Sequence, residues 1–390
     1  MRKEMKDTMR RRLRLEELER RWLLSGLWQG TDIDGDLVTV QLRGPGQLVV
    51  TSTAEGEGEQ IDLIELFGAG RSSKLWVTTV QAGGDGYADV AAMDATGQAL
   101  REILVEGNIG DLSARSVKKI ALYSAERPDG ERGQWTIDGG VAQLYATGDL
   151  YDVDIYLGGD ASKVVVEGSL VDATLVVDGQ LRRMEVFGDV AEDALIQSAG
   201  RLTTLLIYGY LDGSTVEAGG DIKLLHVGQD IVGSTVYSGD VIDRLYVDNA
   251  IDESVIEAAG GIRAIDAWGW ITTSDIRAGD EGIGKLYAYN LSDVNIQAQG
   301  AVRQVYLDAY APRTDWDHLY VVVDDGWYWP TYDADYVDVI YVHDVPTYYY
   351  DVNYWDVYYD GGYYYDAWYY DPYYWDAGGY YDWYYYDWYY

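Results

Sequence analysis

The chain has 390 residues, of which 48% are hydrophobic, so it can bury a large core. Its net charge of −37 argues against nucleic acid as a partner, because phosphate binding depends on basic patches. The absence of Cys excludes disulfides, thiolate metal sites and a cysteine nucleophile. No apolar run reaches the roughly 18 residues of a membrane-spanning helix, so the sequence predicts no transmembrane helix.

The first segment, residues 1–27, is basic and its apolar residues fall near helical spacing, which predicts an amphipathic helix that Gly26 would end. Its sequence LERRWLLSG resembles the LEPR-XLL motif, which marks the N-terminus of many surface-associated proteins of planctomycetes and related bacteria. The motif positions are Leu18, Glu19, Arg21, Leu23 and Leu24, and Arg20 stands in place of the proline of the motif. The resemblance implies a sorting signal of an exported cell-surface protein. The alternative is a helix that caps the following β-structure, and the two roles can coexist.

Residues 28–138 contain segments that alternate like strands, among them 36–52 and 60–67, and residues 107–124 resemble a degenerate repeat. The ends of a repeat array must differ from its middle, because an unpaired end exposes apolar core and free backbone groups. The region is therefore predicted to form irregular β-coils or an N-terminal cap.

Two acidic loops in this region are candidate calcium sites. Asp32, Asp34 and Asp36 lie in TDIDGDL, and Asp85 and Asp89 lie in GGDGYADV. Ca²⁺ takes oxygen ligands, but the first loop lacks the Gly position and the bidentate Glu of an EF-hand, and the second loop occurs once. A β-turn and a surface loop are the favoured interpretations. Ca²⁺ is thus a hypothesis beside the alternative that the chain needs no cofactor.

The firmest pattern is a repeat of about 20 residues through residues 139–310. Three aliphatic columns recur at this period. The first is Leu150, Leu170, Val190, Leu211, Ile231, Ile251, Ile271 and Leu291; the second is Val176, Ile196, Val216, Val236, Ile256, Ile276 and Ile296; the third is Leu202, Ile222, Ile242, Ile262, Ile283 and Val302. Short β-branched alternations broken by Gly and Asp are typical of strands and turns. The sequence predicts an all-β fold, a parallel β-solenoid whose columns stack as internal ladders.

A polar column lies beside residues that are predicted to point inward, namely Leu225, Leu245 and Ile265. Because neighbours on a strand point to opposite faces, this column is predicted to form an outward ladder. Its members are His226, Tyr246, Asp266, Tyr287 and Tyr306. Such a stripe can stack on a sugar face, with Trp268 and Trp270 as one wall, but aligned side chains also stabilise adjacent strands, which is the favoured interpretation.

No catalytic pattern is visible in the sequence. It lacks G-x-S-x-G, a P-loop, H-E-x-x-H and a dinucleotide fingerprint. Its three His residues are scattered, and its many Asp residues fall where turns require them. The sequence therefore favours a protein that is not an enzyme.

The last segment, residues 311–390, has no Lys, Arg or Glu after Arg313 and consists largely of Tyr, Trp and Asp. Its spaced carboxylates keep an aromatic chain soluble until cations screen them. Such a tail can associate with itself, stack on carbohydrate or adsorb to surfaces, and its interaction residues are predicted to be Trp355, Trp368, Trp375, Trp383 and Trp388. A low-complexity extension without a defined role is the alternative. Residues up to about 345 still alternate, so the solenoid can continue into this segment.

Together these segments predict an exported structural or adhesive protein at the bacterial cell surface, in which a rigid solenoid spacer presents the tail. Its expected partners are an envelope component, carbohydrate or another copy of the tail. A carbohydrate-binding or polysaccharide-degrading β-helix protein that uses a surface groove is the first alternative. A solenoid that stacks end to end into filaments is the second.

Overall fold

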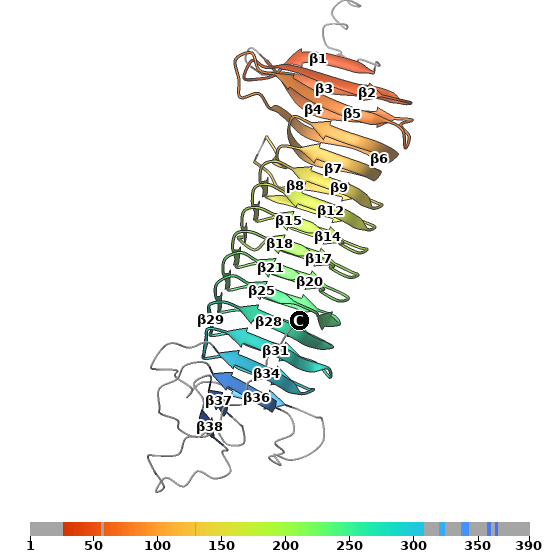
Figure 1. The fold of residues 1–390 in the computed structure, drawn as a ribbon. Helices are drawn as coiled ribbons and strands as arrows, with labels where there is room; N and C mark the ends of the chain where they lie inside the picture. Colours follow the sequence, from red (N-terminus) through yellow and green to blue (C-terminus); the bar gives the residue numbers. More distant parts are fainter. Residues whose placement is uncertain are drawn as a thin grey trace, which may run out of the picture.

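The computed structural model describes residues 26–55, 58–128 and 130–307, and the backbone of strands at 320–323, 337–342, 357–359 and 363–365. These residues form an elongated stack of β-strands (Figure 1). The predicted parallel β-solenoid with coils of about 20 residues is confirmed, since strands of successive coils pair in parallel at that spacing. In this described part no helix has the length and apolar character needed to cross a bilayer. The helix predicted in residues 1–27 falls almost entirely outside the described residues.

The stack begins with antiparallel strands, which together with the next two strands are called the end region (β1 to β7). Strands β1 (Leu27–Thr31), β2 (Leu37–Arg43) and β5 (Lys74–Val80) pair antiparallel in that order. Strands β3 (Gln47–Glu55) and β4 (Gly58–Phe67) form an antiparallel hairpin. Antiparallel pairing satisfies the backbone hydrogen bonds of strands that follow one another in the sequence and needs no crossover connection, which suits the end of a parallel array.

Two long strands convert this arrangement into parallel coils. The first part of β6 (Ala88–Val105) pairs in parallel with β4, and its second part pairs in parallel with β5. Strand β7 (Gly107–Leu122) then pairs in parallel with β6 along most of its length. The next coil stacks on β7 through strands β8 (Gly133–Ile137) and β9 (Val141–Ala146).

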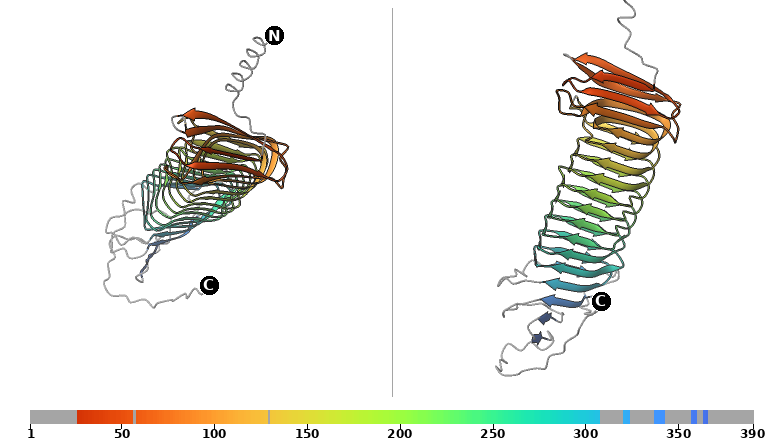
Figure 2. Two further views of the ribbon diagram at one scale, coloured as in Figure 1. Left: turned by 90° about the horizontal axis from the view of Figure 1, so that it is seen from above. Right: turned by 45° about the horizontal axis from the view of Figure 1, so that its top comes forward.

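Each regular coil contributes a strand to each of three columns, and the coils nest when seen along the stack (Figure 2). The column of short strands comprises β10 (Leu150–Tyr151), β13 (Leu170–Val171), β16 (Val190–Ala191), β19 (Leu211–Asp212), β22 (Ile231–Val232), β26 (Ile251–Asp252), β29 (Trp270–Thr272) and β32 (Asn290–Ser292). The next column comprises β8 (Gly133–Ile137), β11 (Val153–Leu157), β14 (Thr174–Val177), β17 (Leu195–Ser198), β20 (Thr215–Ala218), β23 (Thr235–Ser238), β27 (Val255–Ala258), β30 (Asp275–Ala278), β33 (Asn295–Ala298) and β35 (Tyr320–Val323).

The remaining column comprises β9 (Val141–Ala146), β12 (Ala161–Val166), β15 (Met184–Val186), β18 (Leu205–Ile207), β21 (Leu225–Val227), β25 (Leu245–Val247), β28 (Gly261–Ala267), β31 (Gly282–Ala288), β34 (Val302–Leu307), β36 (Val337–Val342) and β37 (Val357–Tyr359). Strand β24 (Val241–Ile242) pairs with the start of β28, and β38 (Tyr363–Tyr365) pairs antiparallel with β37. Strands β35 and β36 pair in parallel with the last regular coil, and β37 pairs in parallel with β36, so parallel stacking extends to Tyr359 within the aromatic segment.

The core of the regular coils consists of stacked aliphatic side chains. The first and third predicted columns pair in register, and their members are buried. Burial of each such side chain contributes about 1.5–3 kcal/mol, so the ladders account for much of the stability of the stack. Close stacking also leaves no room at some corners: a Cβ on Gly279 would lie 1.7 Å from the carbonyl oxygen of Ala259.

One member of the second predicted column is wrong. Leu175, not Val176, pairs with Ile196, and Val176 pairs with Gln197. The cause is an extra residue at the corner after β16, where Glu192 and Asp193 both have positive φ, whereas the corresponding corners of other coils carry one such residue. Each column therefore contains one step of 21 residues where it passes this insertion, such as Leu175 to Ile196 and Val190 to Leu211.

A ladder of buried hydroxyls runs beside the aliphatic columns, and its members are Ser214, Ser234, Ser254 and Ser274. The backbone N–H of each of the first three donates to the Oγ of the next, at 3.0, 3.1 and 3.1 Å. Each hydroxyl donates to the carbonyl two residues earlier in its own coil. The ladder thus satisfies backbone groups that would otherwise be buried without partners.

Candidate functional site

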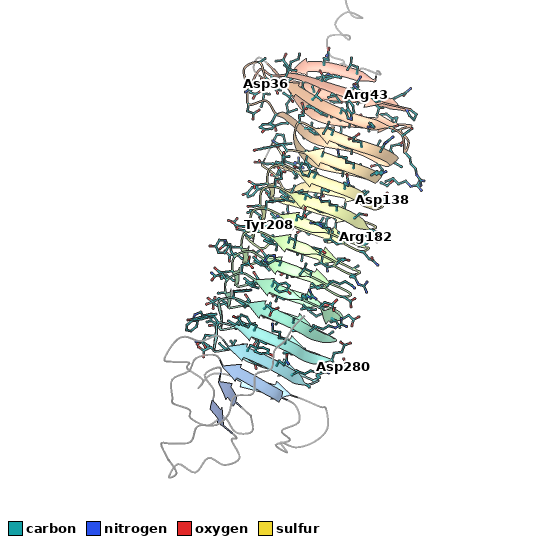
Figure 3. The ribbon with its side chains drawn as sticks, in the orientation of Figure 1. Asp36, Arg43, Asp138, Arg182, Tyr208 and Asp280 are labelled. Carbon is teal, nitrogen blue, oxygen red and sulfur yellow. The ribbon has the colours of Figure 1, made fainter. Side chains whose placement is uncertain are left out.

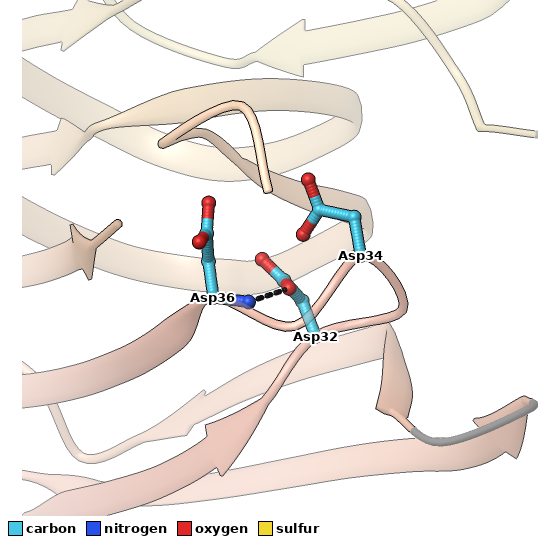
Figure 4. Close-up of side chains that lie close together, drawn as sticks. All are labelled: Asp32, Asp34 and Asp36. Carbon is cyan, nitrogen blue, oxygen red and sulfur yellow. Dashed lines mark hydrogen bonds between the residues drawn. The ribbon is translucent and has the colours of Figure 1, made fainter. Parts of the chain in front are cut away.

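The first acidic loop joins β1 to β2 and folds as a tight turn. The backbone N–H of Asp32 donates to the carbonyl of Asp36 at 2.9 Å, and the N–H of Gly35 donates to the carbonyl of Asp32 at 3.2 Å. Gly35 has φ of 101°, a value at which a side chain would be strained. The predicted turn is therefore present, and it brings three carboxylates together (Figure 4). Figure 3 shows that Asp36 lies at the end of the stack formed by the N-terminal strands.

Asp36 holds the second acidic loop against the first. Its Oδ1 accepts hydrogen bonds from the backbone N–H groups of Ala82, Gly83 and Gly84 at 2.6, 3.0 and 2.8 Å, and its Oδ2 accepts one from Gly86 at 2.6 Å. These donors lower the pKa of Asp36 to about 2, because they favour the charged form. The carboxylate of Asp36 is thus fully occupied in fixing the loop.

Asp34 adds a further link between the two loops. Its Oδ2 accepts a hydrogen bond from the backbone N–H of Asp85 at 2.8 Å. Gly84 permits this approach, because a Cβ there would lie 2.0 Å from the same oxygen. The two acidic segments, some fifty residues apart in the sequence, therefore form one structure.

Asp32 is the most enclosed of the three carboxylates, with 7% of its surface exposed. Its Oδ1 accepts a hydrogen bond from the N–H of Asp36 at 2.7 Å, but its buried Oδ2 has no hydrogen-bond partner. Burial, and then a hydrogen bond that the neutral Asp32 carboxyl can donate to Asp34, raise the pKa of Asp32 to about 7. A carboxylate oxygen from each of Asp32, Asp34 and Asp36 lies within 4.8 Å of the others.

The other two calcium candidates lie beside this cluster and have their own partners. The side chain of Asp85 accepts a hydrogen bond from the N–H of Tyr87 at 2.9 Å. The side chain of Asp89 accepts one from Asn108 at 2.7 Å, and burial raises the pKa of Asp89. Among the described residues, the carboxylates close enough to share an ion are those of the first loop.

The polar column on the coils pairs in register, one residue from each successive coil. His226 contacts Tyr246 edge-on at 6.3 Å between ring centroids, and its Nε2 lies 2.9 Å from Asp248. Lys285 forms an ion pair with Asp266 at 2.7 Å and lies 5.6 Å from the ring centroids of both Tyr287 and Tyr306. These contacts join neighbouring coils, as the structural interpretation of the ladder expects.

Beside this column lies a group of exposed aromatic side chains. Trp268 is 68% exposed and Trp270 39% exposed. Trp268 contacts Tyr287 edge-on, with 6.2 Å between the ring centroids, and the ring centroids of Trp270 and Tyr289 are 6.4 Å apart. The four rings stand on two adjacent coils; the two tryptophans are exposed, whereas Tyr287 and Tyr289 are half-buried.

Arg132 is a residue whose role the sequence did not reveal. It donates to Asp152, Asp154 and Asp172 at 2.9, 2.8 and 2.9 Å and so joins three successive coils. Burial alone would lower the pKa of Arg132, but the hydrogen bonds to Asp172 and Asp154 raise it. The signal in the sequence was the spacing of Arg132, Asp152 and Asp172, which follows the 20-residue period.

The predicted sorting and tail residues lie outside the described residues. This holds for the five motif positions from Leu18 to Leu24 and for the five tail tryptophans from Trp355 to Trp388. The backbone of the nearby strands places Tyr306, Tyr341 and Tyr358 at successive positions of one register.

Comparison with known proteins identifies no relative. No protein-family model matches the chain, and no curated protein or solved structure matches it significantly.

Proposed function

We propose that the chain is an exported structural protein of the bacterial cell surface, in which the solenoid is a rigid spacer and the aromatic segment makes the contacts. The observation that carries the proposal is the unbroken parallel register from β8 to β34. Each coil rises about 4.8 Å, so eight coils span roughly 40 Å. Because each coil contacts its neighbours through ladders on every column, the stack is expected to resist bending.

Two features of the sequence support the remaining parts of the proposal. The resemblance of residues 18–24 to a surface-sorting motif supports export. The repeated Tyr, Trp and Asp of residues 311–390 offer many weak contacts, and many weak contacts on one chain add up through avidity. A spacer with such a segment at one end holds it away from the envelope.

Deletion of residues 343–390 tests the spacer and the tail separately, because it keeps β35 and β36 stacked on the last regular coil and removes all five tail tryptophans. Attachment to cells or surfaces is expected to be lost, while the β-sheet signal in circular dichroism and the unfolding of the coils persist. A full-length variant with Ala at the five tail tryptophans controls for length and is expected to lose most of the attachment. Unchanged attachment in both variants contradicts the role of the tail.

Removal of residues 1–25 tests the sorting role. The variant is expected to accumulate inside the cell with the coils folded, and cell fractionation measures this. Normal surface display of the truncated chain contradicts export through this segment.

The exposed aromatic group supports a second candidate function, carbohydrate binding on the side of the coils. Trp268 and Trp270 present ring faces that can stack on sugar rings. Sedimentation with insoluble polysaccharides measures binding by the wild type and by a double variant that carries Trp268→Ala and Trp270→Ala. Phe187→Ala is a matched control. Phe187 is also exposed and stacks on Tyr208 of the neighbouring coil, and this pair lies several coils away from Trp268 and Trp270. Binding that survives both tryptophan substitutions contradicts this function.

A further inference from the structure

We propose that the carboxylates of Asp32 and Asp34 bind a hard divalent cation, of which Ca²⁺ is the probe of choice, and that this ion joins the two acidic loops of the end region. The donors are all oxygens, and hard cations such as Ca²⁺ and Mg²⁺ prefer these ligands. The ion would complete a link that the backbone hydrogen bonds of Asp34 and Asp36 already begin.

An unpartnered buried oxygen points to this ligand. Oδ2 of Asp32 is buried without a hydrogen bond, although Oδ1 of the same carboxylate accepts one from Asp36. A buried carboxylate oxygen without a partner is costly, so native structures supply a donor, a proton or a cation. In Figure 4 the carboxylate of Asp32 lies between those of Asp34 and Asp36, which offer no donor while they are charged.

The surrounding charge also favours a cation. Among the described residues, no Lys or Arg forms an ion pair with Asp32, Asp34 or Asp36, so the three carboxylates have no basic counter-charge. Asp36 uses both of its oxygens on the loop from Ala82 to Gly86. The free ligand positions are therefore Oδ2 of Asp32 and the oxygen of Asp34 that does not accept from Asp85, and water would supply the rest of the coordination shell.

Binding would stabilise the point at which the N-terminal strands meet the first coils. The loop after β1 is tied to the loop between β5 and β6, and an ion between the carboxylates would hold both loops together. The protection of the loop backbone from exchange with solvent should therefore depend on the ion.

Hydrogen–deuterium exchange on the full chain tests the proposal. The protein is stripped of metal with a chelator and titrated with Ca²⁺, and in parallel with Mg²⁺ and with Na⁺ at equal ionic strength. Saturable protection of the amides of residues 82–86 is expected with a divalent cation and not with Na⁺. This local measurement excludes ions bound diffusely by the acidic tail.

Three variants decide between a built site and general attraction. Asp32→Asn and Asp34→Asn are expected to raise the cation concentration at half-protection by roughly tenfold or more, because Asn keeps one oxygen ligand but loses the charge of the carboxylate. Asp212→Asn, an exposed carboxylate on β19, is expected to leave it unchanged. Asp34 is exposed, so its substitution keeps the test open if Asp32→Asn fails to fold. Absence of cation-dependent protection in the wild type, or equal midpoints in the wild type and Asp34→Asn, overturns the proposal.

Discussion

The end region and the regular coils are held together by different kinds of pairing. In the end region, β1, β2 and β5 pair antiparallel and two acidic loops meet through side-chain hydrogen bonds to backbone. In the regular coils, each strand pairs in parallel with the equivalent strand one coil away, and the same contact recurs. Repetition therefore stabilises the middle of the stack, whereas its end needs contacts that occur once.

The largest expected effect comes from Trp135, which lies at the junction of the two regions. It is fully buried, pairs with Leu112 of β7 and Ile155 of β11, and donates from Nε1 to the carbonyl of Gly110 at 3.0 Å. Trp135→Ala should destabilise the junction by roughly 3–5 kcal/mol, because it leaves a large cavity. Native-state hydrogen exchange should then show the end region opening separately from the coils.

Two further substitutions make the junction prediction specific. Trp135→Phe should cost less than Trp135→Ala, since most of the ring volume remains. Trp268→Ala should change stability by about 0.5 kcal/mol or less, because Trp268 is exposed. Equal opening free energies in the wild type and Trp135→Ala would show that the junction does not couple the two regions.

The second-largest effect is expected from a substitution in the hydroxyl ladder of the regular coils. Ser234→Ala removes the acceptor of the buried N–H of Ser214 and should destabilise the local coils by about 1–3 kcal/mol. The exchange rate of the Ser214 amide is the direct measurement. Ser292→Ala is the control, because Ser292 is only half-buried and lies outside the ladder. An unchanged Ser214 amide contradicts the ladder.

The third effect tests the ion-paired clamp between coils. Arg132→Gln leaves Asp152, Asp154 and Asp172 close together without their common counter-charge. The expected loss is about 1–2 kcal/mol at low salt and less at high salt, since Arg132 is partly exposed. Thermal unfolding at two ionic strengths measures it. Arg182→Gln is the control, as Arg182 is more exposed and lies 4.0 Å from Asp160, and it should have little effect.

The smallest expected effect is a pH dependence at Glu185. Burial would raise the pKa of Glu185, but two basic side chains lower it below its ordinary value of 4.5. Nε of Arg183 lies 2.7 Å from Oε1 of Glu185, and Nζ of Lys163 lies 3.4 Å from Oε2. A lowered pKa contributes stability above the ordinary value, and this stability is lost as the pH falls below it. Glu185→Gln should therefore reduce stability by about 1 kcal/mol or less at pH 7. The difference from the wild type should shrink at pH 3, and a constant difference contradicts this assignment.

Much of the regular region was predictable from the sequence, because its contacts are periodic. A side chain such as Ile231 contacts the equivalent side chains one coil before and one coil after it. Aliphatic residues that recur every 20 positions in the sequence are therefore sufficient to predict the packing. The outward direction of His226 followed in the same way from its buried neighbour Leu225. The error at Val176 arose where one coil holds an extra residue, since a period alone does not say at which corner an insertion lies.

The contacts of the end region could not be predicted from the sequence. Each acidic loop was recognisable in the sequence as a group of carboxylates, but separately each was a weak candidate. Their meeting depends on how β1, β2 and β5 pair, and this brings Asp36 onto the backbone of residues 82–86. The 20-residue period is therefore sufficient to predict the repeating stack, because equivalent contacts recur in successive coils. The joining of the acidic loops and the unpartnered oxygen of Asp32 were decided by the tertiary structure, because contacts between distant segments that occur once leave no period to detect.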